Sequence, residues 1–213
     1  FIFLIVLFIS LKTFHIQDGG LYYTFTHGLD QDFHLSIAQR YVAMPQIPPQ
    51  DPYVAGYDIA YNWFMHVMFG EISLISGIGL LDVFKIIVSI ASALIFLDTY
   101  LLAMLIFKSD NKAALGASIL YIFSSGLSWV YILSQQYSAS SVDLFNSLVY
   151  QWPGITLLKY DPTSLYFFLP QPQTFGLLAT IFCLYIFILS LRSRSMAVAA
   201  ITGLSMASLV FYH

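Results

Sequence analysis

Long apolar runs alternate with two polar stretches along this chain. A helix needs about 20 mostly apolar residues to cross a bilayer, and the sequence contains four runs of this kind and one shorter run at its start. They predict membrane-spanning helices at about 1–11, 83–107, 113–133, 174–191 and 196–212. The polar stretches 12–82 and 134–173 lie between these spans. The pattern predicts an all-α, polytopic transmembrane helix bundle that forms one domain.

Composition agrees with a membrane protein. Hydrophobic residues make up 59% of the chain and charged residues 9%, and the mean hydropathy is +0.78, which is unlike a soluble protein. The net charge is -3, so the chain lacks the basic surface that binding of a nucleic acid requires. The single Cys183 excludes a disulfide framework and a cysteine metal site. We expect a multi-pass integral protein whose partner is the lipid bilayer, in a prokaryotic plasma membrane or the endoplasmic reticulum.

Basic residues predict the orientation, because Lys and Arg concentrate in short cytoplasmic turns. Lys108 and Lys112 flank one short turn, and Arg192 and Arg194 lie in another. With both turns inside, the two polar stretches become outer loops, and these loops hold eight of the ten Asp residues. The chain starts with Phe1 inside an apolar run and ends at His213 after another, so we expect an N-terminal part of a longer protein.

The first outer loop contains its own structural signals. Asp32 can cap a helix over 33–44, and the proline-rich stretch 45–52 must be extended or turning. A second helix is expected from Tyr57 to about Ser76, lying near the membrane interface. On that helix a polar stripe is expected at Asp58, Asn62 and His66, which are spaced four residues apart.

The start of this first helix holds the main chemical candidates, Asp30 and Asp32. If the chain is already helical at Asp30, then Asp30 and His34 share a face. A carboxylate beside an imidazole suits general-base chemistry or a divalent cation. The alternative is structural, with Asp32 as a helix cap and Asp30 as a solvated loop residue.

This arrangement resembles the GT-C superfamily of membrane glycosyltransferases, which includes protein O-mannosyltransferases and the lipid A aminoarabinose transferase. In that family an Asp follows the first span, with an aromatic residue or His about four residues later, as Asp30 and His34 do here. Next in that family comes a Tyr-containing juxtamembrane helix that ends in Phe-Gly. It is followed by a basic residue at the start of the second span. The matching elements are 57–63, Phe69-Gly70 and Lys85.

The resemblance implies transfer of a sugar from a polyprenyl-phosphate donor to the hydroxyl of a glycan, lipid or protein acceptor, outside the cytoplasm and with inversion. Asp30 would be the base, with Asp32 as the second catalytic carboxylate. The sequence has Asp-Gln-Asp where the family has Asp-Glu. This difference leaves open both a metal-free site and one in which Asp30 and Asp32 hold Mg²⁺ or Mn²⁺.

Further polar residues are candidates for substrate binding. Basic groups are needed for the leaving phosphate, although Arg40 could equally be a snorkelling surface residue. Asp161 is the candidate second acidic residue of the family, and the two glutamines of the second outer loop suit sugar hydroxyls or free backbone groups. The substrate-binding candidates are His34, Arg40, His66, Lys85, Lys159, Asp161, Gln171 and Gln173.

A different class of function is the alternative: a lipid or solute transporter, or a structural subunit of a membrane complex. Asp98 lies well inside a predicted span, and an ionisable group there is a functional candidate. The competing interpretation is an Asp hydrogen-bonded to a neighbouring helix. The chain shows no paired intramembrane charges or inverted repeats, which are typical of transporters.

Overall fold

The computed structural model describes residues 1–23, 28–123 and 172–208. The described part is mostly helical, with one small sheet. Its elements are α1 (Ile2–Thr13), β1 (Phe14–Gln17), β2 (Gly20–Tyr23), α2 (Gly28–Ala43), α3 (Phe64–Ser76), α4 (Leu80–Ile106), α5 (Asn111–Phe123), α9 (Pro172–Ser193) and α10 (Met196–Ser208).

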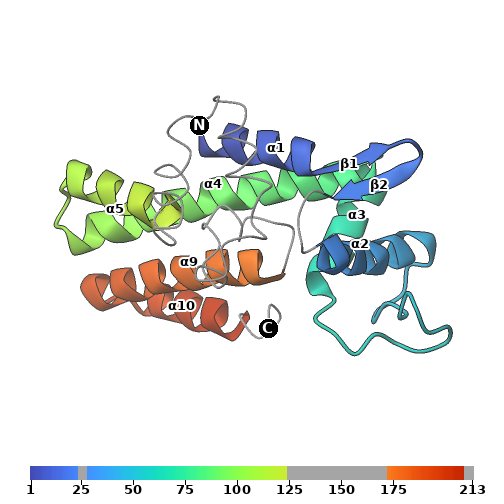
Figure 1. Cartoon of the computed structure of the whole chain (residues 1–213). Helices are drawn as coiled ribbons and strands as arrows, with labels where there is room; N and C mark the ends of the chain where they lie inside the picture. The colour runs from blue at the N-terminus through green and yellow to red at the C-terminus, as the bar shows by residue number, and fades with distance from the viewer. Residues whose placement is uncertain (24–27, 124–171, 209–213) are drawn as a thin grey trace, which may run out of the picture.

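Helix α4 is the central helix of the described part. It packs against α1, α5 and α9, while α10 folds back along α9 (Figure 1). Helices α4 and α9 are long and apolar enough to cross a membrane, judged by length and composition. With 27 residues, α4 is about 40 Å long. These two helices correspond to the spans predicted at 83–107 and 174–191.

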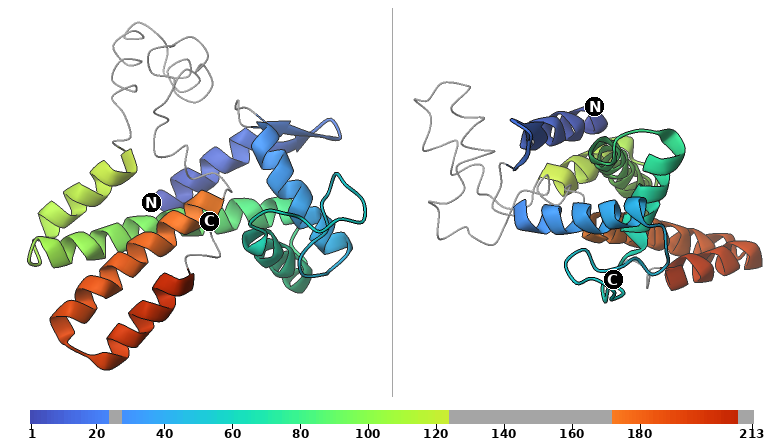
Figure 2. Two further views of the ribbon diagram at one scale, coloured as in Figure 1. Left: turned by 90° about the horizontal axis from the view of Figure 1, so that it is seen from below. Right: turned by 90° about the vertical axis from the view of Figure 1, so that its right-hand side faces the viewer.

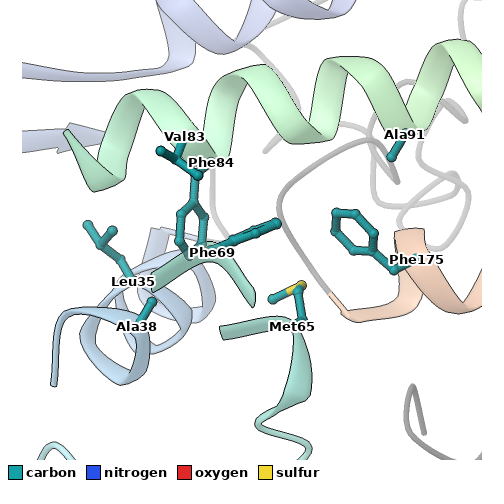
Figure 3. Packing of buried hydrophobic residues seen from close by; sticks show 8 residues of the cluster. All are labelled: Leu35, Ala38, Met65, Phe69, Val83, Phe84, Ala91 and Phe175. Atoms are coloured by element: carbon teal, nitrogen blue, oxygen red, sulfur yellow. The ribbon is translucent and has the colours of Figure 1, made fainter. Parts of the chain in front are cut away.

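Two clusters of buried side chains hold the helices together. One lies between α1, α4, α5 and α9, around Val88 and Ile95. The other joins α2 and α3 to the first half of α4 (Figure 3). At its centre the Phe69 ring meets Phe84 edge-on with 4.4 Å between ring centroids, and Phe175 of α9 lies 5.4 Å from Phe69. The loop helices are therefore packed onto the end of α4 through a shared aromatic core.

The two basic turns lie at the same end of the structure. Nη2 of Arg192 donates a hydrogen bond to the Leu105 carbonyl at 2.6 Å, which joins the end of α9 to the end of α4. Helices α2 and α3 lie at the opposite end of α4 (Figures 1 and 2). This agrees with the prediction that the first loop and the basic turns are on opposite sides. Helix α3 has 13 residues and is about 20 Å long, which is too short to cross a bilayer.

The all-α prediction is wrong at residues 14–23, which form an antiparallel hairpin. Its turn is Asp18-Gly19, with φ of 51° and 76°. Both turn residues have positive φ, as in the type I′ turns that match the twist of paired strands, and Asp-Gly is a favoured sequence there. The sequence pattern had placed these residues at the start of the first outer loop, with no strand predicted there.

The predicted helix from Tyr57 to Ser76 is too long, because α3 begins at Phe64. The preceding residues are held in extended pairing: the Asp51 amide donates to the Tyr57 carbonyl at 2.8 Å, and the Ile59 amide donates to the Pro49 carbonyl at 2.9 Å. Asp58 forms a bridge with Gln50 in this segment. Asp58, Asn62 and His66 therefore do not form a stripe on one helix.

Other predictions extend past the described residues. The predicted spans 113–133 and 196–212 begin as α5 and α10, and their later parts lie outside the described residues, as do residues 134–171 of the second outer loop. Asp98 is buried in α4 at 9% exposure. Its expected hydrogen bond to a neighbouring helix does not occur with any residue of the described part.

Candidate functional site

Helix α2 carries both candidate catalytic carboxylates. It begins at Gly28, five residues before the predicted start at 33, so Asp32 lies inside the helix and its predicted role as a cap is wrong. Acidic residues in a first turn are stabilised by the positive end of the helix dipole, which explains the early start. The side chain of Asp32 is exposed, whereas that of Asp30 lies outside the described part.

The helical backbone separates the two carboxylate positions. Residues two apart in an α-helix lie about 200° apart around its axis. Asp30 and Asp32 therefore occupy different sides of α2. Because the side chain of Asp30 lies outside the described part, the Mg²⁺ or Mn²⁺ site at Asp30 and Asp32 stays a prediction. No group of three or more His, Cys, Asp or Glu suited to a metal ion occurs among the described residues.

Asp30 and His34 are one helical turn apart on one side of α2, as the sequence predicted for a helix that includes Asp30. His34 reaches α3, where its Nδ1 lies 2.9 Å from Nε2 of His66. The exposed fractions are 2% for His34 and 0% for His66. Two histidines 32 residues apart in the chain are thus a buried hydrogen-bonded pair at the contact between α2 and α3.

The surroundings of His66 favour one arrangement of protons. Burial lowers the pKa of His66 to about 3, and the nearby His34 adds to this shift. The other ring nitrogen, Nδ1, lies near the carbonyls of Trp63 and Asn62, although without hydrogen-bond geometry. Carbonyls can only accept, so they favour a proton on Nδ1 and leave Nε2 to accept the proton of His34 Nδ1. In a neutral His34 the remaining nitrogen, Nε2, is then a base.

Three aromatic rings lie beside the histidine pair, and two of them, Phe33 and Tyr61, contact it directly. The Phe33 ring stacks on Tyr53 with centroids 6.1 Å apart and meets Tyr61 edge-on at 5.3 Å. The Tyr61 ring in turn lies 5.8 Å from His34 and 6.0 Å from His66. No pattern in the sequence indicated that these rings belong to a site. Their proximity depends on the fold of the loop between α2 and α3.

Arg40 has a structural contact in this loop. Its Nη2 donates a hydrogen bond to Oε1 of Gln50, which ties the last turns of α2 to the proline-rich segment. Snorkelling toward solvent is not what the structure shows for this side chain, because it is partly buried. The contact positions the loop that carries Tyr53.

Lys85 lies in a hollow of about 700 Å³ at the start of α4. The hollow is lined by the hairpin, by one side of α2, by Ser73 of α3 and by the first turns of α4. Lys85 is only 6% exposed, and its ammonium group contacts the exposed Asp82 carboxylate at 3.3 Å. Apolar walls are supplied by Leu35, Val42, Leu80 and Leu81, and polar groups by Gln39 and Ser73.

Four predicted substrate-binding residues cannot be placed here. Lys159, Asp161 and Gln171 lie outside the described residues, and Gln173 belongs to α9 with an undescribed side chain. The other four lie in three places: His34 and His66 form the buried pair, Arg40 contacts Gln50 in the loop, and Lys85 lies in the hollow. Comparison of the chain with protein-family models, curated proteins and solved structures finds no match.

Proposed function

We propose that this chain is part of a membrane glycosyltransferase that moves a sugar from a polyprenyl-phosphate donor to an acceptor hydroxyl on the extracytoplasmic side. One observation carries the proposal: Asp30 stands one turn before His34, whose imidazole is hydrogen-bonded to His66 beneath a loop packed on the end of a span-length helix. Acid–base groups are thereby concentrated at the end of the molecule opposite the basic turns.

In this proposal Asp30 is the general base. It takes the proton of the acceptor hydroxyl as the oxygen attacks the anomeric carbon and the bond to phosphate breaks, which inverts the configuration. His34 and His66 are positioning residues in this proposal, because a buried pair in a fixed tautomer orients neighbouring polar groups. Neither imidazole needs to contact the sugar, which refines the expectation that both bind substrate.

The hollow around Lys85 suits the phosphate end of the donor. Its volume of about 700 Å³ is within the range of small-molecule sites, which combine apolar walls with a few polar groups. A cation beside the amino end of α4 can stabilise the charge that develops on a leaving phosphate. Apolar walls next to a span-length helix fit the first isoprene units of a lipid carrier.

Donor turnover by matched variants tests the proposal. Membranes containing the full chain are supplied with polyprenyl-phosphate mannose or polyprenyl-phosphate glucose, and the release of polyprenyl phosphate is measured. Asp30→Asn should reduce release by about 100- to 10,000-fold, the usual cost of losing a general base. Asp18→Asn is the control, since the hairpin turn at Asp18 has a positive φ of 51° that Asn tolerates.

Two results would oppose the proposal: equal turnover in the two variants, or turnover no higher than in membranes lacking the chain. Either result would favour the non-enzymatic alternative of a transporter or structural subunit. Comparable expression and melting temperature of both variants are required for the comparison.

A further inference from the structure

The three rings above the histidine pair form an exposed platform, defined here as Phe33, Tyr53 and Tyr61. The Phe33 and Tyr53 rings are nearly parallel, with 9° between their planes. Tyr53 is 63% exposed and Tyr61 41% exposed. Large aromatic rings gathered at a surface usually mark a place where something binds.

The platform is held in place before any ligand arrives. The Asp51 carboxylate accepts hydrogen bonds from the amides of Tyr53 and Val54 at 2.8 and 3.0 Å, which fixes the turn that carries Tyr53. The Gln50–Asp58 bridge closes the loop. Arg40 ties Gln50 to α2. A surface fixed in this way binds with little loss of conformational entropy.

The charges near the platform indicate the class of ligand. Asp32 and Asp58 are exposed; the guanidinium of Arg40 contacts this loop but is hydrogen-bonded to Gln50, and residues 41–70 contain no Lys or Arg. Carboxylates repel an anionic lipid surface or a phosphate, but they accept hydrogen bonds from hydroxyl groups. The faces of aromatic rings carry partial negative charge and attract the positively polarised C–H groups of a sugar ring.

We infer that the platform is a binding subsite for a neutral saccharide. A pyranose ring would stack on the face of Tyr53, which is nearly parallel to Phe33, with Tyr61 standing edge-on to Phe33 at its side. The sugar hydroxyl groups would donate to Asp32 or Asp58. Tyr61 of the platform contacts His34 and His66, and His34 is one helical turn from Asp30. If the proposed function holds, this saccharide is the acceptor, which is then a neutral glycan. Saccharide binding itself does not require the proposed function.

Saccharide binding to the full chain tests the inference. The protein is placed in phosphatidylcholine nanodiscs, because alkyl maltoside detergents carry a sugar that would compete. Maltotriose and mannotriose are the neutral probes, and saturation-transfer NMR reports both binding and the sugar protons in contact with rings. The expected result is saturable binding with a Kd of about 1 mM or tighter.

Variants locate the bound sugar. Tyr53→Ala should weaken binding by about tenfold, the equivalent of 1.4 kcal/mol, whereas Tyr53→Phe should keep most of it, because the ring face remains. Tyr57→Ala is the matched control, since Tyr57 is 68% exposed in the same loop and its ring contacts none of the platform rings in the described part. Melting temperatures establish that each variant is folded.

The outcomes separate this inference from the proposed function. No saturable saccharide binding, or equal loss in Tyr53→Ala and Tyr57→Ala, overturns the inference even if donor turnover depends on Asp30. Preference for anionic phospholipid vesicles over saccharides also overturns it. Saccharide binding that depends on Tyr53 supports it, even in a protein that shows no donor turnover.

Discussion

The buried histidine pair should make the protein less stable in mild acid. His66 has an exposed fraction of 0%, and its pKa is lowered from 6.5 to about 3 in the folded protein. Between these two pH values the unfolded chain binds more protons than the folded one. The free energy of unfolding therefore falls as the pH falls from about 6.5 toward 3.

The size of this effect follows from the shift. Each unit of pKa difference corresponds to about 1.4 kcal/mol, and the folded ring stays neutral until the pH approaches 3. Between pH 7 and pH 5 the loss is about 2 kcal/mol, because only the unfolded His66 is protonated in that range. This is a large part of the stability of most domains.

The assay compares the wild type with His66→Gln. The amide oxygen of Gln can accept the proton of His34 Nδ1 in place of Nε2, but the side chain does not titrate. Denaturant unfolding in nanodiscs is followed at pH 7, 6 and 5. The wild type should lose about 2 kcal/mol more than the variant between pH 7 and 5. Identical pH dependence in the two proteins would refute the reasoning, as would a wild type that gains stability in acid.

Two further variants probe the packing and the hollow. Gly70→Ala should destabilise the protein by about 1–3 kcal/mol through overpacking, because the added Cβ would lie 2.6 Å from Cδ1 of the buried Tyr41 ring. Gly116→Ala is the control, since a Cβ there meets nothing within 4 Å. Equal melting temperatures of the two variants would contradict the close contact. Lys85→Met should change the free energy of unfolding by less than about 1 kcal/mol, since its partner Asp82 is exposed. The same variant should raise the KM for the lipid donor at least tenfold. An unchanged KM would show that the hollow is not part of the proposed site.

Local patterns in the sequence predicted much of the fold. Apolar runs located α4 and α9, and the basic turns predicted which ends lie together. Residues 57–63 were misplaced because their spacing also suits a helix, whereas the actual backbone bonds join them to Pro49 and Asp51. The hairpin at Asp18-Gly19 could have been predicted from that dipeptide alone.

The candidate site was only partly predictable, because it depends on contacts between distant segments. Asp30 and His34 could be paired from their spacing within one helix. The contact of His34 with His66 joins two helices across 32 residues, and no periodicity encodes it. Lys85 was identified as a basic candidate, but the hollow around it is built from four separate segments, and no single segment indicates its shape.

The anomeric configuration of the transferred sugar tests the central claim most directly. Purified full chain is incubated with a polyprenyl-phosphate sugar of known configuration and a neutral oligosaccharide, and the new linkage is determined by NMR of its anomeric proton. A single displacement assisted by Asp30 predicts a product with the configuration opposite to that of the donor. A product of retained configuration, or no product when donor and saccharide are both bound, would contradict the account.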